Sequence, residues 1–264
     1  MHWIVQDNVY AEDARDALVD ALGRFGIPFT AVAMLPRSGA LSPEPTPSGP
    51  VMVCGSVGMN QLARERGWQP GSFLNANHGY PACVAHWGQD MLNAGARISA
   101  FRDVEPAGER VFIRPAVDSK YFTGCVMDAD EVRDWRDALV RGERSPVRCS
   151  PSVNGDTQVV CGPPVTIYKE CRFFVVDGSV VAWSTYRQGG APVAGADVDP
   201  ASMRHAEACV RRWQPARAFV LDTALTPDGP RVVEVNCINS AGFSRADVER
   251  IVRAVEAMKP WANA

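Results

Sequence analysis

Lysine is scarce in this sequence. Only three of its 27 basic residues are lysines, namely Lys120, Lys169 and Lys259, and the others are arginines. A uniform excess of arginine reflects a GC-rich genome more readily than a function. It makes each lysine informative, because the coding bias works against it and because a compact, mobile ammonium group suits a phosphate.

Three other features are missing, and each absence excludes a class of protein. The net charge is −3, and the scattered arginines argue against electrostatic binding of nucleic acid. No apolar run approaches the ~20 residues that a membrane span needs. The N-terminus lacks the basic start and apolar stretch of a secretory signal. We therefore expect a cytoplasmic protein without a membrane or nucleic-acid partner.

Familiar catalytic and metal motifs are also missing. The eight cysteines are spread along the chain without the C-x-x-C spacing of zinc or redox sites. A phosphate loop of the G-x-x-x-x-G-K-[ST] type is absent. No serine or cysteine stands in a persuasive arrangement with a histidine and an acid, so a protein nucleophile is not expected.

The chain is long enough for one large domain or for two to three packed subdomains. It has 264 residues, of which 46% are hydrophobic and 22% charged, as in ordinary globular proteins. Its first part alternates strands at 3–5, 29–35 and 51–54 with helices at 14–25 and 59–66. This alternation predicts a parallel sheet.

The second part of the chain changes character. Asp177-Gly178 and Asp228-Gly229 each mark a hairpin turn, residues 188–199 are expected as a loop, and Ser244 is expected to cap the last helix. The expected strands are at 111–114, 165–168, 172–176, 179–186, 219–224 and 232–236, and the expected helices include 131–140 and 201–213. We predict an α/β domain over residues 1–105 and an α+β domain over residues 106–264.

The second hairpin carries the strongest candidate site. Glu234 and Asn236 are two residues apart on one strand, so both side chains point to the same face. If Leu225 pairs with Arg231, Asp222 lies opposite Glu234 and three oxygen-bearing side chains converge. Such ligands suit magnesium, which completes its coordination with waters and substrate phosphates. The alternative is a polar strand face that points to solvent. Such a face would carry Lys, Thr or Arg as readily as Asp, Glu and Asn.

Two further polar segments are weaker candidates when taken singly. A buried strand ends at Arg114-Pro115 and leads through Asp118-Ser119-Lys120 to Phe122-Thr123-Gly124, a loop of a kind that can close over phosphates. The segment from Tyr168 to Arg172 alternates charges before an apolar run. For each segment alone, the plainer interpretation is favoured, namely a surface loop for the first and an exposed strand edge for the second.

In combination, these segments resemble the ATP-grasp superfamily, and within it the clade of stand-alone domains named for two arginines and one lysine. The resemblance covers residues from about 50 to about 250 and depends on the order and spacing of the motifs. The segments that carry it are Phe112-Ile113-Arg114-Pro115, Asp118-Ser119-Lys120, Phe122-Thr123-Gly124, Glu170, Arg172-Phe173-Phe174-Val175, Tyr186-Arg187, Leu221-Asp222, Glu234-Val235-Asn236 and Asn239-Ser240-Ala241-Gly242-Phe243.

The resemblance implies an ATP-grasp fold. In this fold an N-terminal parallel α/β domain precedes two α+β lobes, here residues 106–186 and 187–264, which clasp ATP. Arg114 stands where many members of the superfamily carry a phosphate-binding lysine, and Lys120 falls in the flexible loop over the phosphates. The residues implied in ATP binding are Arg114, Lys120, Tyr168, Lys169, Glu170 and Arg172.

The resemblance also implies the remaining site residues. The catalytic charges would be Lys120, Arg172 and Arg187. The ligands of two magnesium ions would be Asp222, Glu234 and Asn236. The substrate pocket would be formed by Gly55, Ser56, Arg187, Asn239, Ser240 and Gly242.

The activity implied is ATP- and magnesium-dependent ligation of a carboxylate to an amine, on a small molecule or peptide. The carboxylate would pass through an acyl phosphate, with release of ADP and phosphate. Two alternatives stay open: an ATP-binding regulatory module without turnover, and an ATP-dependent kinase on the same fold. The substrates stay open, as does the choice between a monomer and a homodimer.

Overall fold

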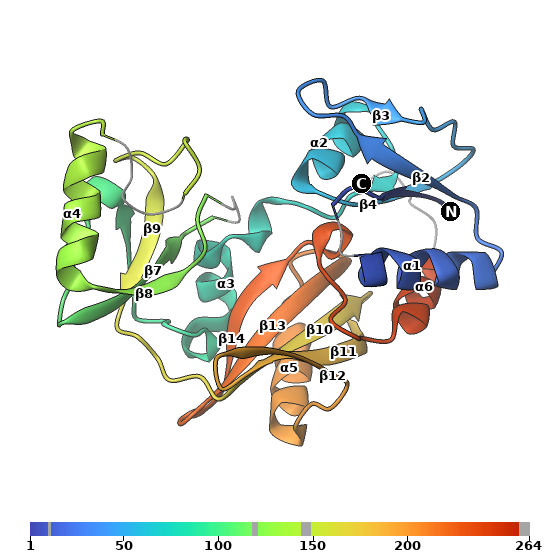
Figure 1. Ribbon diagram of the computed structural model, residues 1–264. Coiled ribbons are helices and arrows are strands. Elements are labelled where there is room, and N and C mark those ends of the chain that lie inside the picture. The colour runs from blue at the N-terminus through green and yellow to red at the C-terminus, as the bar shows by residue number, and fades with distance from the viewer. Residues whose placement is uncertain (10–11, 118–120, 144–148, 259–264) are drawn as a thin grey trace.

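The computed structural model describes residues 1–9, 12–117, 121–143 and 149–258. Within these residues the strands form a mixed sheet at the N-terminus, a four-stranded sheet and a second five-stranded sheet. Figure 1 shows the four-stranded sheet at one end of the molecule and the N-terminal sheet at the other, with the second five-stranded sheet between them. Among the described residues, no helix is both long and apolar enough to span a bilayer.

The N-terminal sheet has the order β3-β2-β1-β4-β5, and all its pairs are parallel except β2 with β3. This confirms the predicted parallel sheet. Trp3 and Val5 face α1, whereas Ile4 faces α2, as the two-residue period of a strand requires. Its elements are β1 (His2–Gln6), α1 (Glu12–Arg24), β2 (Phe29–Met34), β3 (Leu41–Ser42), β4 (Val51–Cys54), α2 (Val57–Glu65) and β5 (Pro70–Gly71).

A helical connection leaves the N-terminal sheet and packs on the second five-stranded sheet. It consists of η1 (Ala76–His78), α3 (Tyr80–Trp87) and η2 (Gly88–Asp90). Trp87 is buried, and its indole nitrogen donates a hydrogen bond of 3.0 Å to the carbonyl of Cys209. The N-terminal part of the chain therefore contributes a helix to the core of the C-terminal part.

The four-stranded sheet is antiparallel, with the order β6-β9-β7-β8. Phe101, Phe122 and Trp135 fill the core between this sheet and α4, and the Trp135 ring meets the two phenylalanine rings edge-on at centroid distances of 4.7 and 4.9 Å. Its elements are β6 (Arg97–Ala100), η3 (Phe101–Asp103), β7 (Arg110–Pro115), β8 (Cys125–Asp128), α4 (Ala129–Val140) and β9 (Gln158–Gly162).

The second five-stranded sheet is antiparallel, with the order β12-β11-β10-β13-β14. Phe173 and Leu221 face a core with α3 and α5, and Phe174 and Val220 face a core with α1 and α6. Its elements are β10 (Lys169–Val176), β11 (Ser179–Gln188), β12 (Ala191–Gly195), α5 (Pro200–Arg212), β13 (Ala218–Thr226), β14 (Gly229–Asn236), η4 (Ile238–Ser240) and α6 (Val248–Ala257).

The boundary between the two lobes differs from the one expected at residue 186. β10 pairs with β11 on one side and with β13 on the other, so residues 169–188 belong to the same sheet as 218–236. The link between the sheets is residues 163–167, which carry no regular structure. The strand expected at 165–168 is therefore absent, because pairing on both sides begins only at Lys169.

Two other local expectations are wrong. The segment expected as a loop over 188–199 contains β12, which is joined to β11 through Gly189 and Gly190, both at positive φ. This is the backbone that a two-residue hairpin turn requires. The last helix is capped by Asp247, whose side chain accepts the Arg250 N–H, whereas Ser244 lies upstream at positive φ.

Candidate active site

The candidate site is the polar end of one sheet face. On β10, Phe174 packs in the core beneath α6, and Arg172 and Glu170 follow on the same face at two-residue intervals. On β13, Val220 is followed in the same way by Asp222. The face thus changes from apolar at Phe174 and Val220 to charged at Arg172 and Asp222.

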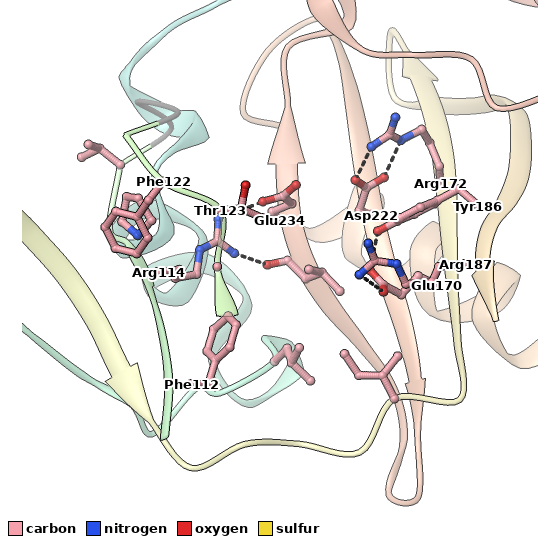
Figure 2. Close-up of a pocket in the computed structure, with 16 residues that line it drawn as sticks. Phe112, Arg114, Phe122, Thr123, Glu170, Arg172, Tyr186, Arg187, Asp222 and Glu234 are labelled. Atoms are coloured by element: carbon pink, nitrogen blue, oxygen red, sulfur yellow. Dashed lines mark hydrogen bonds and ion pairs between the residues drawn. The ribbon is translucent and has the colours of Figure 1, made fainter. Parts of the chain in front are cut away.

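A cavity of about 370 Å³ lies over this polar surface, between the two antiparallel sheets. Figure 2 shows Arg114 and the apolar side chains of Phe112 and Phe122 on one side of it, with Glu234 and Asp222 on the other. Its charged lining residues are Arg114, Glu170, Arg172, Arg187, Asp222 and Glu234. One side of the cavity therefore combines apolar side chains with the charge of Arg114, and the other side carries the carboxylates.

The hairpin register confirms that Asp222 lies opposite Glu234. The predicted pairing of Leu225 with Arg231 is wrong by one residue, since Leu225 pairs with Pro230. A bulge between Asp222 and Thr223 compensates for this difference, because β14 contains one extra residue, Val233, at that point.

Asn236 joins the two carboxylates. Its amide nitrogen donates hydrogen bonds of 3.0 Å to Oδ2 of Asp222 and of 3.0 Å to Oε1 of Glu234. The three predicted metal ligands are thus brought together. The positive end of an amide dipole lies between two carboxylate oxygens, where a cation would also be favoured.

Arg172 holds Asp222 in place. Its Nε and Nη2 donate to the two carboxylate oxygens at 2.9 and 2.7 Å, and Nη1 donates to the Gly242 carbonyl at 3.0 Å. Complete burial raises the pKa of Asp222, and Arg172 opposes that rise. Burial works against the charge of Arg172, but the Asp222 carboxylate outweighs it and raises the pKa of Arg172.

Tyr186 connects Arg172 with Glu170, a contact that sequence reasoning missed. The Tyr186 hydroxyl donates a hydrogen bond of 2.7 Å to Glu170, and the Arg172 guanidinium lies 5.0 Å from the centre of the Tyr186 ring. Burial and the carboxylates of Asp222 and Glu170 raise the pKa of Tyr186. The hydroxyl is therefore a stable donor at neutral pH. The alternation of side chains along β11 could have predicted that Tyr186 points to this face. It could not have predicted that Glu170 is its hydrogen-bond partner.

Arg114 approaches from the opposite sheet. Its Nη2 donates to Oε2 of Glu234 at 2.9 Å, and its Nη1 donates to the carbonyl of Val233 at 3.1 Å. The Tyr80 ring centre lies 5.9 Å from the guanidinium, and burial raises the pKa of Tyr80 to about 12. Arg114 thus contacts one of the predicted metal ligands directly.

A smaller hollow of about 200 Å³ adjoins the start of β10. Tyr168, Lys169, Glu170 and Arg187 all line it. The Lys169 ammonium donates to the Asp197 carbonyl at 3.0 Å, and Tyr168 is exposed. Arg187 also lines the main cavity, where it lies 3.4 Å from Glu170. These four predicted nucleotide or substrate residues are therefore neighbours.

The predicted substrate residues outside β11 do not line the main cavity. Asn239 is fully buried against the N-terminal sheet: its amide nitrogen donates to the carbonyls of Val53 and Gly71, and its amide oxygen accepts the Phe73 N–H. The Gly55 N–H donates to the Asn239 carbonyl at 2.8 Å.

The other predicted substrate residues lie near these contacts or near Arg172. Ser56 is the N-cap of α2, Ser240 lies in η4, and the Gly242 carbonyl accepts a hydrogen bond from Arg172. Their role in binding substrate stays a prediction.

Asp118, Ser119 and Lys120 lie outside the described residues. Among the residues that are described, no group of three or more His, Cys, Asp or Glu side chains is arranged to hold a metal ion. The predicted ligand set contains two carboxylates and an amide, so any metal ion there would need additional oxygen ligands from water or substrate.

Comparison with solved structures places the fold. A RimK-domain ATP-grasp protein from Sphaerobacter thermophilus superposes with a TM-score of 0.62 at 15% identity, over 97% of this chain and 100% of the other. The D-cycloserine synthetase DcsG superposes with a TM-score of 0.64 at 13% identity, over 96% of this chain and 98% of the other. The ATP complex of D-alanine–D-alanine ligase from Bacillus anthracis superposes with a TM-score of 0.56 at 12% identity, over 97% of this chain and 91% of the other. No curated protein matches the chain.

A family model also matches the chain, over residues 25–255. It describes the ATP-grasp domain of family 3 in the clade named for two arginines and one lysine. The matched range includes most of the N-terminal sheet and both antiparallel sheets that enclose the cavity. The implied ATP-grasp fold is thereby confirmed. The chain belongs to family 3 of this clade of ATP-grasp domains.

Proposed function

We propose that this protein is an ATP- and magnesium-dependent ligase that joins a carboxylate to an amine. The observation that carries the proposal is the pair of carboxylates in the cavity, Asp222 and Glu234, which lie opposite Arg114 and are joined behind the lining by Asn236. The cavity lies between the two antiparallel sheets of an ATP-grasp fold. Both of the named relatives that are ligases or synthetases share this fold.

The residues of the predicted metal set suit magnesium. Asp222 and Glu234 provide hard oxygen donors, and the Asn236 amide adds a third if its oxygen turns toward the ion. Magnesium, when bound, would neutralise phosphate charge and polarise the transferred phosphoryl group. The bidentate contact from Arg172 keeps the Asp222 carboxylate in one orientation for such a ligand.

The arginines of the cavity serve the phosphates and the acyl group in this proposal. Arg114 and Arg187 present planar groups that can bind phosphate or carboxylate oxygens through two N–H donors. The charge on a carboxylate repels nucleophiles, so its conversion to an acyl phosphate supplies a leaving group. An amine then displaces phosphate and forms the amide. The protein contributes positioning and electrostatic stabilisation, with no nucleophile of its own.

The proposed substrates are small molecules or peptides. The relatives named D-cycloserine synthetase and D-alanine–D-alanine ligase are the basis for this choice of class. A screen that measures ADP release from magnesium and ATP across carboxylic acids and amines, including amino acids and short peptides, tests it. ADP release that needs an acid and an amine together would support the ligase.

Glu234→Gln provides the decisive variant. We expect it to lower magnesium-dependent ADP release by about 100-fold or more, as expected for loss of an electrostatic contact to the reacting charge. Glu143→Gln is the matched control, because Glu143 is exposed and forms its ion pair with Arg141, away from the cavity. Circular dichroism and thermal unfolding would verify that both variants fold. Full ADP release by Glu234→Gln would contradict the assignment of the site.

The same screen distinguishes the alternatives. ADP release with a single acceptor and a phosphorylated product would indicate a kinase. Tight binding of ATP without ADP release under any combination would indicate a regulatory module. The presence of both carboxylates and Asn236 favours turnover over the module, because a nucleotide-binding protein without catalysis has less need of a complete acidic set.

A further inference from the structure

The charges of the main cavity are matched pair by pair. Among its described lining residues there are three carboxylates and three arginines. Asp222 is paired with Arg172 at 2.7 Å, Glu234 with Arg114 at 2.9 Å, and Glu170 with Arg187 at 3.4 Å. A bound cation would therefore have to compete with an arginine for any of these carboxylates.

The pair formed by Arg114 and Glu234 differs from the other two. Arg172 and Asp222 stand on adjacent strands of one sheet, and so do Arg187 and Glu170. Arg114 belongs to β7 of the four-stranded sheet and reaches across the cavity to β14. Figure 2 shows Arg114 and Glu234 approaching each other from separate ribbons. This pair can separate without any change in strand pairing.

The bulge in β14 gives Arg114 a second anchor. Val233 is the extra residue of the bulge, and its carbonyl accepts the Arg114 Nη1 at 3.1 Å. The guanidinium therefore spans one neutral and one charged acceptor on the same strand. This geometry fits the planar fork of arginine better than a lysine ammonium, and it gives a reason for arginine at a position where many members of the superfamily carry lysine.

We propose that Arg114 is an exchangeable partner of Glu234. It occupies the carboxylate while the metal site is empty, and it moves to the nucleotide phosphates when a divalent ion binds Glu234. Both Glu234 oxygens accept hydrogen bonds, Oε1 from Asn236 and Oε2 from Arg114. A divalent ion at this carboxylate repels the guanidinium, and phosphate oxygens attract it. Metal and nucleotide then promote each other's binding. This inference rests on the proposed function, because it assumes a metal and a nucleotide in this cavity.

Manganese binding without nucleotide tests the exchange directly. Free Mn²⁺ is measured by electron paramagnetic resonance during titration of the full chain. Arg114→Ala removes this competitor, so we expect Mn²⁺ alone to bind at least about 5-fold more tightly than in the unmodified protein, the lower end of ordinary coupling between sites. A non-hydrolysable ATP analogue should bind this variant more weakly, because Arg114 no longer contacts the phosphates.

Arg187→Ala is the matched control. It removes the same charge from the same cavity, but Arg187 is paired with Glu170. It should change the affinity for Mn²⁺ without nucleotide clearly less than Arg114→Ala does. Arg114→Lys keeps the charge and loses the fork, so it should give an intermediate Mn²⁺ affinity. In the unmodified protein, Mn²⁺ should tighten binding of the analogue, and this tightening should shrink in Arg114→Ala.

Three outcomes would overturn the proposal. The first is an unchanged Mn²⁺ affinity in Arg114→Ala, and the second is an equal gain in Arg187→Ala. The third is binding of metal and analogue that is independent in the unmodified protein. Failure of the ligase proposal gives a different pattern. In that case the affinities for Mn²⁺ and the analogue would shift as described, while the ADP-release screen would detect no turnover.

Discussion

At the scale of single residues, the site is organised around one ion pair whose carboxylate is buried. The side chain of Asp222 is 1% exposed and that of Arg172 is 15% exposed, and the pair is bidentate. Removing one partner of a buried pair leaves an uncompensated charge, whereas replacing both with apolar residues is often tolerated. The contribution of the pair to the stability of the protein can therefore be measured separately from its role in the site.

The variant Arg172→Met should destabilise the protein by about 3–5 kcal/mol because Asp222 stays buried without its ion-pair partner. The double variant with Asp222→Leu should recover much of this loss in denaturant unfolding. Arg211→Met is a surface control: Arg211 and Glu207 are 4.0 Å apart and exposed, so the change should be within about 1 kcal/mol. A double variant less stable than Arg172→Met would contradict this account.

At the scale of elements, the bulge in β14 sets the geometry of the pocket. Without Val233, the pairs Thr223–Val232 and Asp222–Glu234 would be consecutive in a regular ladder. The extra residue leaves both of these pairs in place and presents a carbonyl to Arg114. Strand pairing on both sides of the bulge would therefore survive the loss of Val233 itself, and the extra residue serves the contact between sheets.

Deletion of Val233 should leave a folded protein, because the pairs on both sides of the bulge keep their register. Binding of an ATP analogue should weaken several-fold, since one anchor of Arg114 disappears and its position is less defined. Val233→Ala is the control, because it keeps the bulge and the carbonyl and should bind the analogue nearly as tightly as the unmodified protein. Calorimetric titration and thermal unfolding measure both effects. A deletion variant with unchanged binding would refute the role assigned to the bulge.

At the scale of the whole molecule, Asn239 links the N-terminal sheet to the strand that carries the candidate metal ligands. It lies three residues after Asn236 and is fully buried. Its side chain bonds backbone groups of Val53, Gly71 and Phe73, and its carbonyl accepts the Gly55 N–H. The predicted substrate segments on the two sides are thus held in fixed relation.

Asn239→Ala should reduce the free energy of unfolding by at least about 2 kcal/mol, because it removes bonds from buried backbone donors and acceptors. Ser240→Ala is the adjacent control: its hydroxyl donates a long hydrogen bond of 3.5 Å to the Cys237 carbonyl, so little change is expected. Urea unfolding of both variants provides the measurement. Equal stability of the two variants would show that Asn239 does not hold the domains together.

Several features follow from the amino-acid sequence alone. The two-residue period of the strands places Glu170 with Arg172 on one face of their strand, and Glu234 with Asn236 on one face of theirs. Because the strands pair in a single antiparallel sheet, these faces coincide. Local patterns therefore assign each of these side chains to a face of its strand, and the order of the motifs indicates the family.

The tertiary structure decided what local patterns cannot express. The hairpin turn is shorter than expected, with Thr226 opposite Gly229, and the bulge restores the register at Asp222. Arg114 and Glu234 are 120 residues apart, and the packing of two separate sheets brings them together. Asn239 has the residue type of a pocket ligand, but domain docking buries it and uses its amide. In each case a residue's partner is set by long-range packing, which depends on the whole chain, whereas its face on a strand depends only on its neighbours.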